Sequence, residues 1–109
     1  MNKYMLLYLA PVDAWQQMAN TAPEEAQKQM ALWEAWFKKQ GSAVVEMGSP
    51  LGNGQNFTAN GSGTTTQAKV AGYSVMEAAA MDNIQAMLGD HPHLALPGSS
   101  IEVLEMASM

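Results

Sequence analysis

The segments of this chain that are predicted to form strands are apolar on both of their faces, and this constrains the fold more than any other feature. In Lys3–Leu9 both alternate sets of side chains are apolar: Met5, Leu7 and Leu9 on one side, Tyr4, Leu6 and Tyr8 on the other. The segment Ala43–Met47 repeats the pattern. A sheet with one face in water alternates apolar and polar side chains. We therefore expect both faces of the sheet to be buried.

Hydrophobic periodicity and turn residues predict six elements in the order β-α-β-β-α-β. Strands are expected at Lys3–Leu9, Ala43–Met47, Lys69–Glu77 and Ser100–Met106, and helices between Thr21 and Gly41 and at Ala78–Leu88. This order is that of the ferredoxin-like α+β fold. Right-handed crossovers place both helices on one face of a four-stranded antiparallel sheet.

The first predicted helix carries the clearest local signals. Thr21 and Glu24 have the spacing of a capping box, and Pro23 fits the first turn. An apolar stripe predicts which residues face the core: Ala26, Met30, Trp33 and Phe37, widened by Leu32 and Trp36.

Between residues 48 and 68 the composition changes to Gly, Asn, Ser and Thr, which predicts a flexible loop. Asn60-Gly61 is a hairpin-turn signal, so part of this loop is expected to fold back as an edge ribbon. The chain has 109 residues, the length of a single domain. We expect one domain over residues 1–109.

Composition excludes several classes of protein. The chain has no cysteine, so neither a disulfide framework nor a thiolate metal site is possible. A net charge of −5 disfavours nucleic acid and anionic membrane surfaces as partners. The apolar run over residues 4–12 is too short for a membrane helix and lacks the features of a signal peptide. We expect a cytoplasmic protein.

One layer of helices covers only one face of the expected sheet. Since both faces are apolar, a second copy of the chain is the simplest cover for the other face. We predict a homodimer with its sheets face to face, forming a dimeric α+β barrel. A cleft between the subunits is a usual place for a small-molecule ligand.

Both histidines of the chain lie in Asp90-His91-Pro92-His93. Histidine titrates near neutral pH, so His91 or His93 is predicted to act as a catalytic acid–base, with Asp90 orienting an imidazole. The alternative is that the histidines only follow a helix C-terminus, where an imidazolium meets the negative end of the helix dipole. A catalytic zinc site needs three protein ligands and a third is not visible, so we expect no metal. The glycine-rich loop lacks nucleotide-binding motifs, and no cofactor is expected.

Three further residues are expected to contact a substrate: Tyr8 in the first strand, Ser49 after the second and Glu102 in the last. Glu102 and Glu105 have opposite parity, so at least one of them faces the cleft or its rim. A buried carboxyl has a raised pKa and can act as a base. A salt bridge at an edge or interface is the alternative for these carboxylates.

Six short segments, in this order, resemble the YCII-related (DGPF-domain) family: Tyr4-Met5-Leu6-Leu7-Tyr8, Trp33-Glu34-Ala35-Trp36-Phe37, Gly48-Ser49-Pro50-Leu51-Gly52, Gly72-Tyr73-Ser74, Gly89-Asp90-His91-Pro92-His93-Leu94 and Ser100-Ile101-Glu102-Val103. The resemblance implies a dimeric α+β barrel of ferredoxin-like protomers in bacterial cytoplasmic proteins. It also implies that some members use a catalytic His–Asp pair.

This chain departs from that pair. The family's histidine aligns near Met30 and its acidic residue near Met47, and neither side chain transfers a proton. Either the chain has lost the pair, or a branch that contains His-Pro-His uses a different site. The pair is therefore not carried over to this sequence.

Three functions are compatible with these features. The first is an enzyme that acts on a small organic molecule, with His91 or His93 as acid–base. The second is a non-catalytic ligand-binding or regulatory dimer, which the missing pair and the Met-rich, charge-poor interior favour. The third is a structural partner protein, which requires an exposed apolar patch.

Overall fold

The main sheet has four strands in the order β2-β5-β1-β6, and every neighbouring pair is antiparallel. The computed structural model describes residues 1–61, 63–65 and 69–108. The strands are β1 (Asn2–Leu9), β2 (Val44–Pro50), β5 (Val70–Ala78) and β6 (Ser100–Glu105). The predicted ferredoxin-like α+β fold is confirmed.

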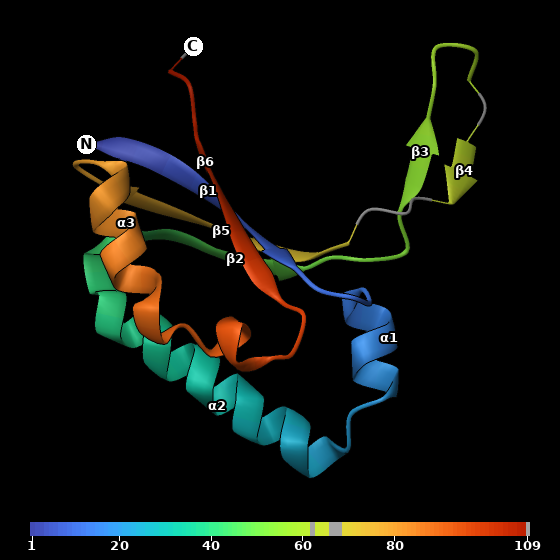
Figure 1. Ribbon diagram of the computed structural model, residues 1–109, viewed down its shortest axis with the longest axis horizontal. Helices are drawn as coiled ribbons and strands as arrows, with labels where there is room; N and C mark the ends of the chain where they lie inside the picture. Colours follow the sequence, from blue (N-terminus) through green and yellow to red (C-terminus); the bar gives the residue numbers. More distant parts are fainter. Residues whose placement is uncertain (62, 66–68, 109) are drawn as a thin grey trace.

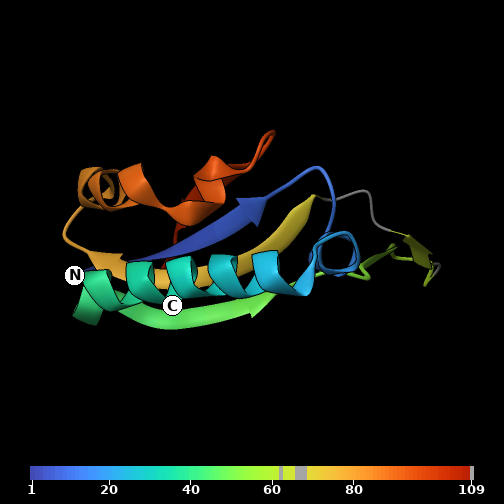
Figure 2. The ribbon, with the colours of Figure 1, turned by 90° about the horizontal axis from the view of Figure 1, so that it is seen from below.

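The helices lie together on one face of this sheet. Figure 1 shows α2 (Pro23–Gln40) and α3 (Met81–Met87) below the strands, and in Figure 2 α2 crosses in front of them. Two 3-10 turns, η2 (Leu88–Asp90) and η3 (Pro92–Ala95), continue this layer after α3. We call the opposite side of the sheet the open face.

The core lies between β1 and this layer. Tyr4, Leu6 and Tyr8 are buried on the helix side of β1, where they pack with Trp36 of α2 and Ile84 of α3. The other alternate set on β1 points to the open face and is half-buried. The two sets of apolar side chains therefore serve two different surfaces.

The structure corrects the predicted inner face of the first helix. Ala26, Met30 and Leu32 are exposed. The residues that are buried or half-buried on α2 are Gln29, Trp33, Trp36, Phe37 and Gln40. The large rings of Trp33 and Trp36 set the rotation of the helix because they pack on the buried residues 8, 91 and 93.

The predicted capping box is also wrong. Ala22 occupies the N-cap of α2 and makes no side-chain hydrogen bond, while Pro23 opens the helix as expected. The hydroxyl of Thr21 instead donates to the carbonyl of Gln17, 2.5 Å away. It is engaged there because an additional helix, α1 (Ala14–Ala19), fills the connection that precedes Thr21.

The second predicted helix begins later than expected. β5 continues to Ala78, and α3 starts at Met81 after a turn. The following residues to Asp90 form η2 rather than more α-helix. No helix in the part of the chain that the structure describes is both long enough and apolar enough to cross a membrane.

β2 extends through Pro50, beyond the predicted end at Met47. The residues that follow include an antiparallel ribbon of β3 (Gln55–Phe57) and β4 (Gly63–Thr65), which confirms that part of the loop folds back. A third short turn, η1 (Gly41–Ala43), joins α2 to β2. Residues 62 and 66–68 of the predicted loop lie outside the described residues.

Gly48 sits in an irregular part of β2 that only glycine fits. Its φ is +82°, and a Cβ there would lie 1.7 Å from the carbonyl oxygen of Tyr73. Gly61 has nearly the same φ, +83°, but a Cβ would meet nothing within 4 Å. Alanine variants of the two glycines therefore distinguish the cost of a positive φ, which both share, from the cost of a steric clash, which only Gly48 has.

We predict that Gly48→Ala lowers the free energy of unfolding by about 1–3 kcal/mol more than Gly61→Ala does. Both variants place alanine at positive φ, and only the first forces β2 away from β5. Urea denaturation of the two variants and the parent measures the difference. Equal losses in the two variants contradict the close approach of Gly48 to Tyr73.

Candidate functional site

His91 and His93 are buried between the sheet and α2, at 2% and 3% exposure. Pro92 starts η3 and holds His91 in an extended conformation at the N-cap of this turn. The Nδ1 atom of His91 accepts a hydrogen bond from the backbone N–H of His93 at 3.0 Å. The first imidazole thus positions the turn that carries the second.

A chain of hydrogen bonds runs from His91 through the core to β2. Because Nδ1 of His91 is an acceptor, the neutral ring carries its proton on Nε2, which donates to the Tyr8 hydroxyl at 3.3 Å. Tyr8 donates to Oγ of Ser74 at 2.7 Å, and Ser74 donates to the carbonyl of Met47 at 2.7 Å. Each donor in this series of hydrogen bonds has an acceptor, and all of the bonds point in the same direction, from His91 to Met47.

His93 is tied to β1. Its Nε2 atom lies 2.8 Å from the carbonyl oxygen of Leu9, to which it donates. Rings surround both imidazoles. The ring centroid of His91 lies 4.2 Å from that of Trp36 and 4.6 Å from that of Trp33, and the Trp33 ring meets Tyr8 edge-on at 4.8 Å. The histidines therefore sit in a closely packed aromatic cluster.

Burial determines the protonation of His91 and Tyr8. It lowers the pKa of His91 from its ordinary 6.5 to about 4, the nearby His93 lowers it further, and the charge of Asp90 partly opposes the change. Burial also raises the pKa of Tyr8 to about 12, against a smaller lowering by its bond to Ser74. At neutral pH His91 and Tyr8 are both uncharged.

A groove of about 580 Å³ lies between α2 and the segment after α3, and His91 is part of its wall. The rest of the lining is mostly apolar: Leu32, Ala35 and Trp36 from α2, and Gly89, Pro92, Leu94 and Ala95 from the facing segment. Lys39 and Asp90 also line the groove. The volume and the apolar lining suit a small organic molecule.

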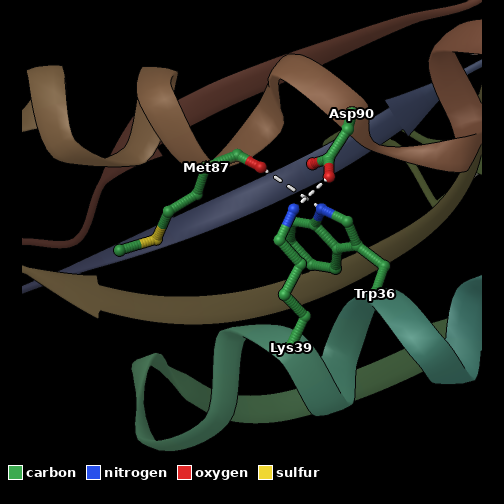
Figure 3. Close-up of polar contacts among 4 residues, drawn as sticks. All are labelled: Trp36, Lys39, Met87 and Asp90. Carbon is green, nitrogen blue, oxygen red and sulfur yellow. Dashed lines mark hydrogen bonds and ion pairs between the residues drawn. The ribbon is translucent and has the colours of Figure 1, made fainter.

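An ion pair between Lys39 and Asp90 links the two walls of this groove. Figure 3 shows the pair beside the indole of Trp36, whose Nε1 donates to the carbonyl of Met87 at 3.2 Å. The bond to Lys39 holds the pKa of Asp90 below its ordinary value. Asp90 is therefore an exposed carboxylate that is paired with a lysine.

The six site residues predicted from the sequence do not form one site. Tyr8, His91 and His93 lie together beneath α2, whereas Asp90 points to Lys39. Among the described residues no hydrogen bond joins Asp90 to either imidazole. Ser49 and Glu102 lie on the open face, in a row across the sheet with Tyr73 and Leu7 between them. The sheet itself separates these two residues from the histidines.

The sequence analysis missed Ser74 and the role of the tryptophans. Ser74 is fully buried and stands at a helix-facing position of an otherwise apolar strand, which is the signal that could have identified it. Trp33 and Trp36 were assigned only to the core, and they also enclose His91. Among the described residues no group of three or more histidine and carboxylate side chains is arranged to hold a metal ion.

Comparisons with known proteins show a distant likeness among solved structures. No family model and no curated protein matches the chain. Among solved structures the chain is similar to 5-chloro-2-hydroxyhydroquinone dehydrochlorinase (TftG) from Burkholderia phenoliruptrix AC1100, solved in complex with 2,5-dihydroxybenzoquinone. The match covers 94% of this chain and 91% of that chain, with 16% identity and a TM-score of 0.48. The resemblance to the YCII-related family stays a prediction.

The low pKa of His91 predicts a loss of stability on acidification. The unfolded chain takes up a proton near pH 6.5 and the folded chain only near pH 4. Stability contributed by the neutral ring is therefore present above pH 6.5 and is lost as the pH falls to about 4, by on the order of 3 kcal/mol. Urea denaturation between pH 4 and 7 measures this change.

The control is His91→Asn, which keeps a side-chain acceptor for the N–H of residue 93 but does not titrate. We expect this variant to be less stable at pH 7 and to lose much less stability between pH 6.5 and 4. Parallel pH profiles of the parent and the variant contradict the assignment of a neutral His91.

Proposed function

We propose that this chain binds a small, largely apolar organic molecule in the groove between α2 and residues 89–95, and that it does so as a homodimer in the cytoplasm. The observation that supports the binding site is an apolar groove of about 580 Å³ with a buried, uncharged His91 in its wall. Such a surface offers mainly apolar contact area and aromatic rings. An ion pair between Lys39 and Asp90 gives the groove its charged groups.

The state of His91 favours binding over acid–base catalysis. Both of its ring nitrogens are hydrogen-bonded within the protein, one to the backbone of His93 and one to Tyr8. A general base needs a free lone pair and a pKa near the working pH. His91 has a pKa of about 4 and its lone pair is occupied.

Catalysis by His91 or His93 is the second candidate, because His91 reaches a groove that has the size of a substrate site. It requires that a substrate displace one of the two hydrogen bonds of His91. The positions where the family's pair was expected offer no substitute, since Met30 and Met47 are both exposed methionines. The predicted substrate contacts Ser49 and Glu102 lie across the sheet and belong to the open face.

Filling the groove tests the binding site. Ala35 lines the groove, whereas Ala31 is an exposed residue of the same helix outside it. We predict that a small organic ligand found by thermal-shift screening raises the Tm of the parent and of Ala31→Phe, and does not raise that of Ala35→Phe. Saturation at about 100 times Kd contributes about 2.7 kcal/mol to the stability of the folded state.

Tryptophan fluorescence gives a second readout of the same event, because the indole of Trp36 lines the groove. A broad library that changes neither Tm nor fluorescence contradicts the proposed site. A ligand recovered unchanged after long incubation supports binding alone. A ligand that is converted by the parent and not by His91→Asn, at saturating concentration, supports the catalytic candidate.

The open face is the surface that the dimer would cover. Met5, Leu7 and Leu9 are half-buried on it and Leu104 is 48% exposed, and none of the helices that the structure describes covers them. A twofold axis presents the same patch on both copies, so an apolar patch is complementary to itself. These observations support the face-to-face homodimer expected from the sequence.

We predict that Leu104→Glu converts the dimer to monomers, raising the dissociation constant by about a hundredfold, because a carboxylate would be buried without a partner. Met30→Glu is the matched control: Met30 is 64% exposed on the helix layer, so the same charge is added away from the interface. Sedimentation equilibrium measures both variants. A monomeric parent at micromolar concentration, or equal dissociation of the two variants, contradicts the proposed interface.

A further inference from the structure

The ribbon of β3 and β4 projects from the sheet on the side away from the helices. It follows the end of β2 and leads toward the start of β5, so it extends from the β2–β5 half of the sheet. In Figure 1 the helices lie below the strands and the ribbon rises above them, and in Figure 2 it lies beyond one end of the sheet. The ribbon therefore flanks the open face.

Phe57 gives this ribbon an apolar surface. It is paired with Gly63, and its ring lies so close to that glycine that a Cβ there would be 2.7 Å from a ring carbon. Even so, Phe57 is 67% exposed. Two strands alone are at best marginally stable in water. Burial of this exposed ring against another surface would therefore stabilise the ribbon.

The ribbon also lacks the usual protection of an exposed strand edge. Proteins commonly place charged side chains on such edges to prevent pairing with other chains. No charged residue lies between Glu46 and Lys69, so the ribbon is uncharged throughout. The whole chain carries a net charge of −5. An uncharged surface can approach a second acidic copy without the repulsion that other surfaces of the chain would meet.

We infer that the ribbon clasps the second copy of the dimer, with Phe57 packed against that copy. This inference rests on the proposed face-to-face dimer. The ribbon stands on the side of the sheet where the second copy lies, at the margin of the interface. Twofold symmetry repeats the contact, so the two ribbons hold the pair of sheets from two symmetric positions.

Replacing Phe57 measures this contact. Phe57→Ser removes the ring from the ribbon, and Met18→Ser makes a matched change on α1, where Met18 is 69% exposed. We expect Phe57→Ser to raise the dissociation constant of the dimer at least about tenfold, because two rings lose their cover. Met18→Ser leaves the constant unchanged, and Phe57→Trp keeps it within a few-fold of the parent.

Hydrogen exchange of the backbone amides of Gln55–Phe57 gives a second readout. We expect slower exchange in the dimer of the parent chain than in the monomer made by Leu104→Glu. An unchanged dissociation constant for Phe57→Ser, together with equal exchange in dimer and monomer, overturns the clasp and leaves the dimer standing. A parent chain that sediments as a monomer overturns the dimer and the clasp together.

Discussion

The buried hydrogen-bond chain from His91 to Met47 is the constraint around which the helix layer is organised. A polar group taken out of water without a partner costs on the order of 1–3 kcal/mol, so each of these groups must be matched. The hydroxyl of Tyr8 donates to Ser74, and Ser74 donates to the carbonyl of Met47. The two side chains thereby connect β1 to β5 and β2. His91 attaches η3 to the same chain, and the rings of Trp33 and Trp36 close over it. The position of α2 over the sheet follows from this cluster rather than from its apolar stripe.

The dependence of α2 on this cluster explains why the sequence predicts the order of the elements but not the orientation of the first helix. Strand positions follow from local alternation and from turn residues, and these gave the correct element order. The rotation of α2 depends on which side chains fill the space between two layers. Trp33 and Trp36 take that space, and Gln29 and Gln40 share the inner side with them, so Met30 and Leu32 turn outward. A stripe of apolar residues does not contain this information.

The contacts in the candidate site also depend on the folded arrangement and not on local sequence patterns. Proximity in sequence suggested that Asp90 orients an imidazole, but a carboxylate at the surface is better placed beside Lys39, fifty-one positions away in the chain. The pairing of Tyr8 with His91 spans 83 positions and depends on the finished fold. Parity could have separated the predicted substrate contacts: Tyr8 faces the helices, whereas Glu102 is the partner of Leu7 and so shares the open face. Ser49 joins that face because β2 is irregular around Gly48, which no periodicity shows.

The sheet divides the molecule into two surfaces, and β2 takes part in hydrogen bonds on both of them. On the helix side, the carbonyl of Met47 ends the hydrogen-bond chain that begins at His91 in the groove wall. On the open face, Glu46 accepts a hydrogen bond from Tyr73, and β2 leads on to the ribbon. Tyr8 and Ser74 therefore connect the position of His91 to the β2 backbone at Met47. The connection holds in both directions, because a constraint on the β2 backbone at Met47 also constrains His91 through the same hydrogen bonds.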